Sequence, residues 1–282
     1  MSYSISSDKF QDPLLKLILE KLTGYFSETN TRFYLIGATA RDIMMSVHNE
    51  KSGRATRDLD IAIAISDWDE YKTVEKGIVN IEGFKKDKNQ KQRFIFLDSF
   101  PLDIVPFGDI KKQDDKIFWP PDETIAMSVL GFSEVGDATF EVEIDKELIV
   151  NIASLAGIFV LKLVAWSERH LENNKDADDM AFIINNYLNI NEKRAVNEYY
   201  ELIYLSGDYT ISTAGAKLLG IDIAHIFKDN KKEKKKIIEI LANEIKKEDE
   251  SRLINQMIET NPNFRYEETF LILKYITEGI KD

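Results

Sequence analysis

The sequence predicts an α+β fold, in which a small mixed β-sheet with flanking helices is followed by an all-helical region. Over the first 150 residues, short apolar runs typical of strands alternate with segments of helical periodicity. From Ser154 onward, only long segments of helical periodicity remain. A chain of 282 residues is long enough for two modest domains. We therefore expect one domain over residues 1–150 and a second, helical domain over residues 151–282.

The elements of the first half follow from the spacing of its apolar residues. Leu15, Ile18, Leu19 and Leu22 recur at helical spacing and predict the first helix. Ser66 is expected to cap the third helix. The expected helices span residues 13–26, 38–47 and 67–76, and the expected strands span 33–36, 59–65, 93–97, 102–105, 140–144 and 148–152. Residues 48–57 are expected to form a loop, and the turn at residues 98–101 is expected to close a hairpin.

The second half is expected to be helical throughout. Its predicted helices span residues 155–171, 176–188, 193–204, 212–219, 231–247, 250–259 and 266–281.

Composition excludes several kinds of site. The chain has no cysteine, so disulfides, thiolate zinc sites and cysteine nucleophiles are excluded. Its three histidines, His48, His170 and His225, have no metal-ligand spacing. No apolar run approaches the roughly 18 residues that cross a bilayer, and the N-terminus has no signal-peptide pattern, so we expect a cytoplasmic protein with no membrane segment. The net charge of -12 repels nucleic acid at long range, so any RNA substrate must be held by a local basic patch.

The first chemical signal is Gly37, between a predicted strand and a predicted helix. A glycine at such a turn lets the backbone approach a phosphate closely, and the helix N-terminus favours anions. Thr39 can add a hydroxyl to the same phosphate. Alone this signal is weak, because glycine is common at strand-to-helix turns.

The second signal is the acid pair Asp58 and Asp60, at the start of the strand over residues 59–65. Side chains alternate across a strand, so both carboxylates point to one face, roughly 6–7 Å apart. Two carboxylates held together repel each other unless a cation or a proton lies between them.

The third signal is Asp103, a single acid inside a short apolar strand. Such an acid is costly to bury unless it is paired or binds a metal. If its strand neighbours the one that carries Asp60, an inter-strand spacing of about 5 Å brings all three acids together. Three converging carboxylates can hold two magnesium ions roughly 4 Å apart, as in nucleotidyl transfer.

These three signals, in this order, resemble the DNA polymerase β-like nucleotidyltransferase superfamily. Residues 37–42 followed by Asp58 and Asp60 resemble the GG-x-x-RD…DxD pattern of tRNA CCA-adding enzymes. Residues 54–60 (RATRDLD) are similar to the R-x-[ST]-x-D-[LI]-D segment of AbiEii-type toxin nucleotidyltransferases, and Lys162 with residues 175–179 (KDADD) is similar to a later signature of that group. The long interval between Gly37 and Asp58 favours the AbiEii-like branch. The resemblance covers residues 33–188.

The resemblance implies an enzyme that uses a nucleoside triphosphate and two Mg2+ ions. Asp58 and Asp60 would bind both ions, and Asp103 would bind the second ion and accept the proton of the attacking hydroxyl. The implied nucleotide-binding residues are Gly37, Ala38, Thr39, Arg41, Arg54 and Lys162. Many members carry Gly-Ser or Gly-Gly where this chain has Gly37-Ala38, and Thr39 is the candidate replacement for the missing serine.

The acceptor implied by the resemblance is a hydroxyl of tRNA or another macromolecule, such as a protein, in a toxin or defence enzyme with an antitoxin partner. Two other functions stay open: an antibiotic-type nucleotidyltransferase with a small-molecule acceptor, and a degenerate nucleotide-binding interaction module. Individual residues also have structural alternatives. Arg41 and Asp42 fit a helix pair that buttresses the turn, and Lys162 fits a lysine whose stem packs in an apolar helix while its ammonium reaches the surface.

Overall fold

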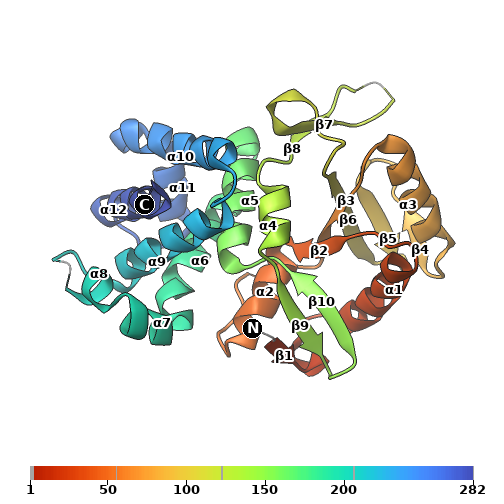
Figure 1. The fold of residues 1–282 in the computed structure, drawn as a ribbon, viewed down its shortest axis with the longest axis horizontal. Helices are drawn as coiled ribbons and strands as arrows, with labels where there is room; N and C mark the ends of the chain where they lie inside the picture. The colour runs from red at the N-terminus through yellow and green to blue at the C-terminus, as the bar shows by residue number, and fades with distance from the viewer. Residues whose placement is uncertain (1–2, 55, 122, 206, 282) are drawn as a thin grey trace. The chain divides into compact units, whose positions relative to one another are not determined.

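The computed structural model describes residues 3–54, 56–121, 123–205 and 207–281 (Figure 1). The chain divides into two compact units, Met1–Ser154 and Leu155–Asp282. The first unit contains a mixed β-sheet with flanking helices, and the second is mainly helical. The predicted α+β class is confirmed.

One mixed sheet organises the first unit, with eight strands among its described residues. Their spatial order is β1 (Tyr3–Ile5), β9 (Phe140–Ile144), β10 (Leu148–Ile152), β2 (Phe33–Ile36), β3 (Leu59–Ala64), β6 (Phe100–Phe107), β5 (Arg93–Phe96) and β4 (Phe84–Lys86). At the centre, β2 and β3 are antiparallel, β3 and β6 are parallel, and β6 and β5 are antiparallel. A separate antiparallel pair consists of β7 (Lys116–Phe118) and β8 (Ala126–Ser128).

The helices of the first unit are α1 (Leu14–Glu28), α2 (Gly37–Val47), α3 (Trp68–Asn80) and α4 (Phe132–Asp137), with short 3-10 turns η1 (Ser7–Lys9) and η2 (Gln113–Asp115). The stripe predicted for the first helix is its buried face: Ile18, Leu19 and Leu22 have no exposed surface. Burying each such side chain contributes roughly 1.5–3 kcal/mol. The stripe therefore explains why this segment is a helix on the sheet.

The second unit consists of α5 (Leu155–Arg169), α6 (Lys175–Ile190), α7 (Glu192–Glu198), α8 (Tyr200–Tyr204), α9 (Ile211–Ile226), α10 (Lys231–Lys246), η3 (Glu248–Glu250), α11 (Arg252–Thr260) and α12 (Tyr266–Lys281). Helices α9 and α12 approach each other at two glycines. A Cβ atom added to Gly220 would lie 2.6 Å from the carbonyl oxygen of Ile276, and one added to Gly279 would lie 3.0 Å from Gly220. No helix of the described residues is both long and apolar enough to cross a bilayer.

Several elements differ from the sequence prediction. The single helix expected over residues 193–204 is two helices, because Tyr199 leaves the helical region with a φ of -131°. The predicted cap Ser66 is wrong: Asp67 is the N-cap of α3, and its carboxylate accepts hydrogen bonds from the backbone N–H groups of Asp69 and Glu70. The three-residue strands β1, β4, β7 and β8 were not predicted, because so short a run shows no periodicity.

We predict that Asp67→Ala lowers the free energy of unfolding by about 1 kcal/mol, because two N–H groups in the first turn of α3 lose their acceptor. Equilibrium urea unfolding followed by circular dichroism measures this change. The matched control is Ser66→Ala, which is expected to change the midpoint little. A larger loss for Ser66→Ala than for Asp67→Ala would show that the cap is misassigned.

Candidate active site

Two acidic residues lie side by side at the centre of the sheet. In the parallel pair of β3 and β6, Asp60 and Asp103 are direct Cα partners. Residues paired in this way point to the same face, across a strand spacing of about 4.8 Å. The strands that carry the two acids are therefore neighbours, as the sequence analysis required.

The next strand adds a cation to the same row. Arg93 on β5 is the Cα partner of Asp103 across the antiparallel pair of β5 and β6. Its guanidinium donates two hydrogen bonds, Nε to Oδ1 and Nη2 to Oδ2 of Asp103, both 2.7 Å long. This two-point geometry gives one of the strongest ion pairs that proteins form. We call Asp60, Asp103 and Arg93 the charged row.

Asp58, which directly precedes β3, is close enough to this row to affect Arg93. The pKa of Arg93 is raised, first by its hydrogen bonds to Asp103 and, against the opposing effect of burial, by attraction to Asp103, Asp58 and Asp60. All three carboxylates thus act on one guanidinium. We call Asp58, Asp60 and Asp103 the carboxylate cluster.

Gly37 lets the N-terminus of α2 approach the cluster. Its φ is +72°, a conformation that residues with a Cβ rarely adopt, and a Cβ placed there would overlap the carboxylate of Asp60. Among the described residues, no side chain caps this helix N-terminus, where an acidic group is favourable because the helix dipole is positive there. Gly37 and Ala38 therefore lie where backbone N–H groups can meet an anion beside Asp60.

Two threonines hold Asp58 in place. The hydroxyl of Thr39 on α2 donates to the backbone carbonyl of Asp58 at 2.6 Å, and the hydroxyl of Thr56 donates to its carboxylate. Thr39 thereby ties α2 to the segment that leads into β3. Its predicted contact with a phosphate stays a prediction.

Arg41 is buried, with 1% of its surface exposed. Its guanidinium pairs with Asp42 at 2.7 Å and donates to the carbonyl of Arg54 at 3.3 Å. A Cβ added to Gly53 would lie 2.7 Å from a guanidinium nitrogen of Arg41. This geometry favours a structural role for Arg41 over contact with a phosphate, because Arg41 fixes the loop before Asp58. The side chain of Arg54 is exposed. Ala55, within the segment 54–60 singled out above, lies outside the described residues.

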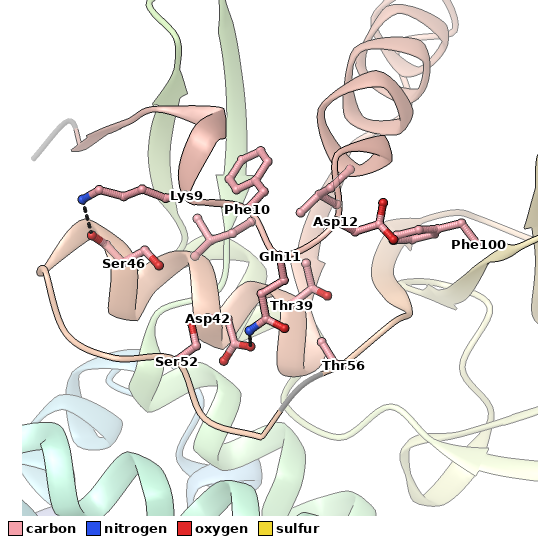
Figure 2. Close-up of a pocket in the computed structure, with 12 residues that line it drawn as sticks. Lys9, Phe10, Gln11, Asp12, Thr39, Asp42, Ser46, Ser52, Thr56 and Phe100 are labelled. Carbon is pink, nitrogen blue, oxygen red and sulfur yellow. Dashed lines mark hydrogen bonds between the residues drawn. The ribbon is translucent and has the colours of Figure 1, made fainter.

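A pocket of about 410 Å3, counted with its open mouth, lies beside α2 in the same unit (Figure 2). Its walls come from residues 9–12, from one face of α2 and from the loop that carries Ser52 and Thr56. Figure 2 shows Gln11 reaching from the N-terminal segment to Asp42 on α2, a hydrogen bond of 3.2 Å. Thr39 and Thr56 both line this pocket, so the hydroxyls that hold Asp58 form part of its wall.

Lys162 belongs to the second unit, on α5. Its ammonium lies 2.7 Å from Asp179 and 3.2 Å from Asp176, both on α6. Arg169 adds two hydrogen bonds of 2.8 Å to Asp176. Asp179 and Asp176 are buried, so these two acids of α6 are neutralised inside the second unit. Burial raises the pKa of Asp176, but the pairing with Arg169 and Lys162 outweighs it and the pKa is lowered.

The donor set of the carboxylate cluster suits a hard divalent cation, which prefers oxygen ligands. Within the described ranges, no three His, Asp or Glu side chains are arranged so that they could hold a metal ion as they stand. Both oxygens of Asp103 are bonded to Arg93. The oxygen donors and the strand register are compatible with a magnesium site, but the described arrangement does not itself form one.

Sequence reasoning missed Arg93, although the signal was present. A hairpin centred on residue 98 pairs residue 93 with residue 103, as observed. The predicted turn at residues 98–101 lies too far along the chain and gives a different register. The observed turn has left-handed conformations at Leu97 and Asp98. Leucine rarely adopts this conformation, so the sequence does not indicate a turn at that position.

We predict that Gly37→Ala lowers the free energy of unfolding by about 1–3 kcal/mol, because alanine is strained at this φ and its methyl group displaces Asp60. Thermal unfolding measures the loss. The matched control is Gly24→Ala in the exposed part of α1, where no atom lies within 4 Å of the added Cβ. That control is expected to gain roughly 0.5–1 kcal/mol, since alanine is the better helix former. Equal effects at both positions would contradict the geometry at Gly37.

We predict that Asp176 makes the stability of the chain sensitive to acid. Its pKa is lower in the folded chain than the ordinary 3.8, so the unfolded chain binds the proton first as the pH falls. The contribution of Asp176 is complete above that ordinary value and is lost as the pH falls through the folded pKa. Asp176→Asn should be less stable than the natural chain at pH 7, and the difference should shrink towards pH 3. Urea unfolding across this range, with the exposed Asp229→Asn as control, tests the sign: a difference that grows in acid would refute it.

Comparison with known proteins gives the family. The model of the AbiEii family, described as "Nucleotidyl transferase AbiEii toxin, Type IV TA system", matches residues 21–271. No protein with a curated description matches the chain. A solved structure titled "The complex structure of CCA-adding enzyme with CTP" is similar over 95% of this chain and 80% of that chain, with 13% identity and a TM-score of 0.32. Because the family model covers most of the chain, this protein belongs to the AbiEii family of nucleotidyltransferase toxins of type IV toxin–antitoxin systems, which implies an antitoxin partner.

Proposed function

We propose that this nucleotidyltransferase transfers a nucleoside monophosphate from a nucleoside triphosphate to a hydroxyl group of tRNA or another macromolecule, with magnesium held by the carboxylate cluster. The observation that carries the proposal is the direct pairing of Asp60 with Asp103 across β3 and β6, with Asp58 at the start of the same segment. The family supplies the reaction class and the nucleotide substrate. The metal, the acceptor and the residue roles are proposed on the chemistry of these side chains.

The proposed roles follow from position. Asp58 and Asp60 would hold both ions, and Asp103 would hold the second. When bound, magnesium would supply positive charge against the phosphate charge that develops during the transfer. The backbone at Gly37 and Ala38 receives the triphosphate at the N-terminus of α2, and Thr39 keeps α2 beside Asp58.

In the proposed reaction, the acceptor oxygen bonds to the α-phosphorus, and the bond between that phosphorus and the bridging oxygen to the β-phosphate breaks. Pyrophosphate leaves with that oxygen. Asp103 accepts the proton of the acceptor hydroxyl on one of the two oxygens that Arg93 contacts. The contact of Lys162 with the triphosphate stays a prediction, since Lys162 is engaged with Asp176 and Asp179.

The acceptor is identified by a label-transfer assay. The natural chain is incubated with Mg2+ and each α-labelled nucleoside triphosphate, together with total tRNA, total protein or small polyols. The acceptor is then analysed by mass. We expect tRNA to gain the mass of one nucleotidyl group, which is a nucleoside monophosphate less one water. Transfer only to a small polyol would favour the antibiotic-type alternative, and nucleotide binding without transfer would favour an interaction module.

We predict that the double variant Asp58→Asn, Asp60→Asn loses transfer by at least about 100-fold, because amides cannot replace two charged ligands. The matched control is Asp109→Asn, which changes an exposed acid of the same unit and is expected to keep the natural rate. Both proteins are compared by rate of label transfer and by thermal unfolding, so that loss of folding is recognised. A double variant that folds and transfers at the natural rate would exclude these carboxylates from the reaction.

A further inference from the structure

The two-point contact between Arg93 and Asp103 places a fixed cation where a metal ligand is proposed. Both oxygens of Asp103 accept hydrogen bonds from the one guanidinium. The side chains are only 23% and 13% exposed, so water screens the pair weakly. Asp58 and Asp60 also attract this guanidinium.

Such a cation solves a problem that the sheet itself creates. The pairing of β3 with β6 fixes Asp60 beside Asp103, and like charges at this spacing repel each other. Asp103 is 9% exposed, so solvent gives little relief. The pairing of β5 with β6 fixes the positive charge of Arg93 next to Asp103.

A divalent cation makes a competing demand on the same oxygens. Magnesium takes its oxygen ligands at about 2.0–2.1 Å in a strict octahedral geometry. The guanidinium fork takes one lone-pair site on each oxygen of Asp103, and its positive charge opposes a divalent cation on the remaining sites. A magnesium ion that takes a site now used by the fork displaces the corresponding hydrogen bond.

We propose that Arg93 is an internal counter-ion of the carboxylate cluster, which holds Asp103 in the metal-free enzyme and releases it when a divalent cation binds. Arg93 is thus a positioning residue that competes with the metal and lowers its affinity. This inference rests on the proposed function for the identity of the metal site. It concerns binding and stability, so it is tested apart from transfer.

The test compares the natural chain with Arg93→Gln, Arg93→Lys and Lys85→Gln. Lys85→Gln is the matched control, because it also removes one positive charge and one ion pair from this sheet, between Lys85 and Asp98, with both side chains well exposed. Titration calorimetry with MgCl2 gives the Kd of the metal. Thermal unfolding in EDTA and in saturating MgCl2 gives the stability of the two states.

Competition predicts opposite effects on the two readouts. Arg93→Gln should unfold at a lower temperature in EDTA, since the cluster has lost its counter-ion, and should bind Mg2+ at least about tenfold more tightly. Arg93→Lys, whose ammonium cannot span both oxygens of Asp103, should have an Mg2+ affinity between those of the natural chain and Arg93→Gln. It replaces Arg93→Gln in the test if the glutamine variant does not fold. Lys85→Gln should bind Mg2+ like the natural chain.

Several outcomes overturn the inference. An unchanged or weaker Mg2+ affinity in both Arg93 variants would show that the ion pair of Arg93 with Asp103 is merely structural. If none of the proteins binds Mg2+, the ion pair is likewise merely structural. An equal gain of affinity in Lys85→Gln would show a general effect of net charge. One further outcome separates this inference from the proposed function. If the Arg93 variants bind Mg2+ more tightly but the natural chain transfers no nucleotide to any acceptor, the counter-ion role of Arg93 is supported and the proposed reaction is refuted.

Discussion

Repulsion between carboxylates that the sheet holds side by side is the constraint on which the rest of this site depends. The register of β3 and β6 sets Asp60 beside Asp103 whether or not a cation is present. A folded chain that keeps this register must relieve the repulsion on that face with a cation or a proton. Arg93 supplies it from the neighbouring strand, with two short hydrogen bonds to Asp103. In our account, a divalent cation takes over the same task during nucleotidyl transfer.

A second set of interactions brings α2 and its preceding and following segments to this face. Gly37 removes the side chain that would collide with Asp60, and Thr39 ties the first turn of α2 to the backbone of Asp58. The buried guanidinium of Arg41 fixes the loop around Gly53. Each contact is modest by itself. Together they hold Asp58 next to the N-terminus of α2. The N-terminus of α2 and the carboxylate cluster therefore lie next to each other, as the proposed binding of a metal–triphosphate complex requires.

Much of the fold was predictable because long elements carry a periodic signal. The stripe of Ile18, Leu19 and Leu22 predicted α1, and the apolar run after Asp60 predicted β3. The predicted site took the neighbouring positions of Asp60 and Asp103 as a condition, because an acid inside an apolar strand needs a partner. The register of β3 and β6 meets that condition.

Contacts between residues could not be predicted where they depend on strand register or on tertiary packing. Arg93 was missed because the hairpin turn was placed too late, and a shift of register changes every cross-strand partner. The burial of Arg41 depends on how the loop at Gly53 folds over it, and no local pattern encodes that. Asp67 rather than Ser66 caps α3. Both residue types are good N-caps, so the sequence alone does not distinguish these adjacent positions.

The most direct measurement of the central claim is a crystal structure of this chain grown with MnCl2 and a non-hydrolysable nucleoside triphosphate, with the metal located by its anomalous scattering. Our account predicts manganese bound to carboxylate oxygens of Asp58 and Asp60, with Asp103 turned from Arg93 to the same metal site. Manganese bound elsewhere, with Arg93 still holding both oxygens of Asp103 beside a bound nucleotide, would contradict it.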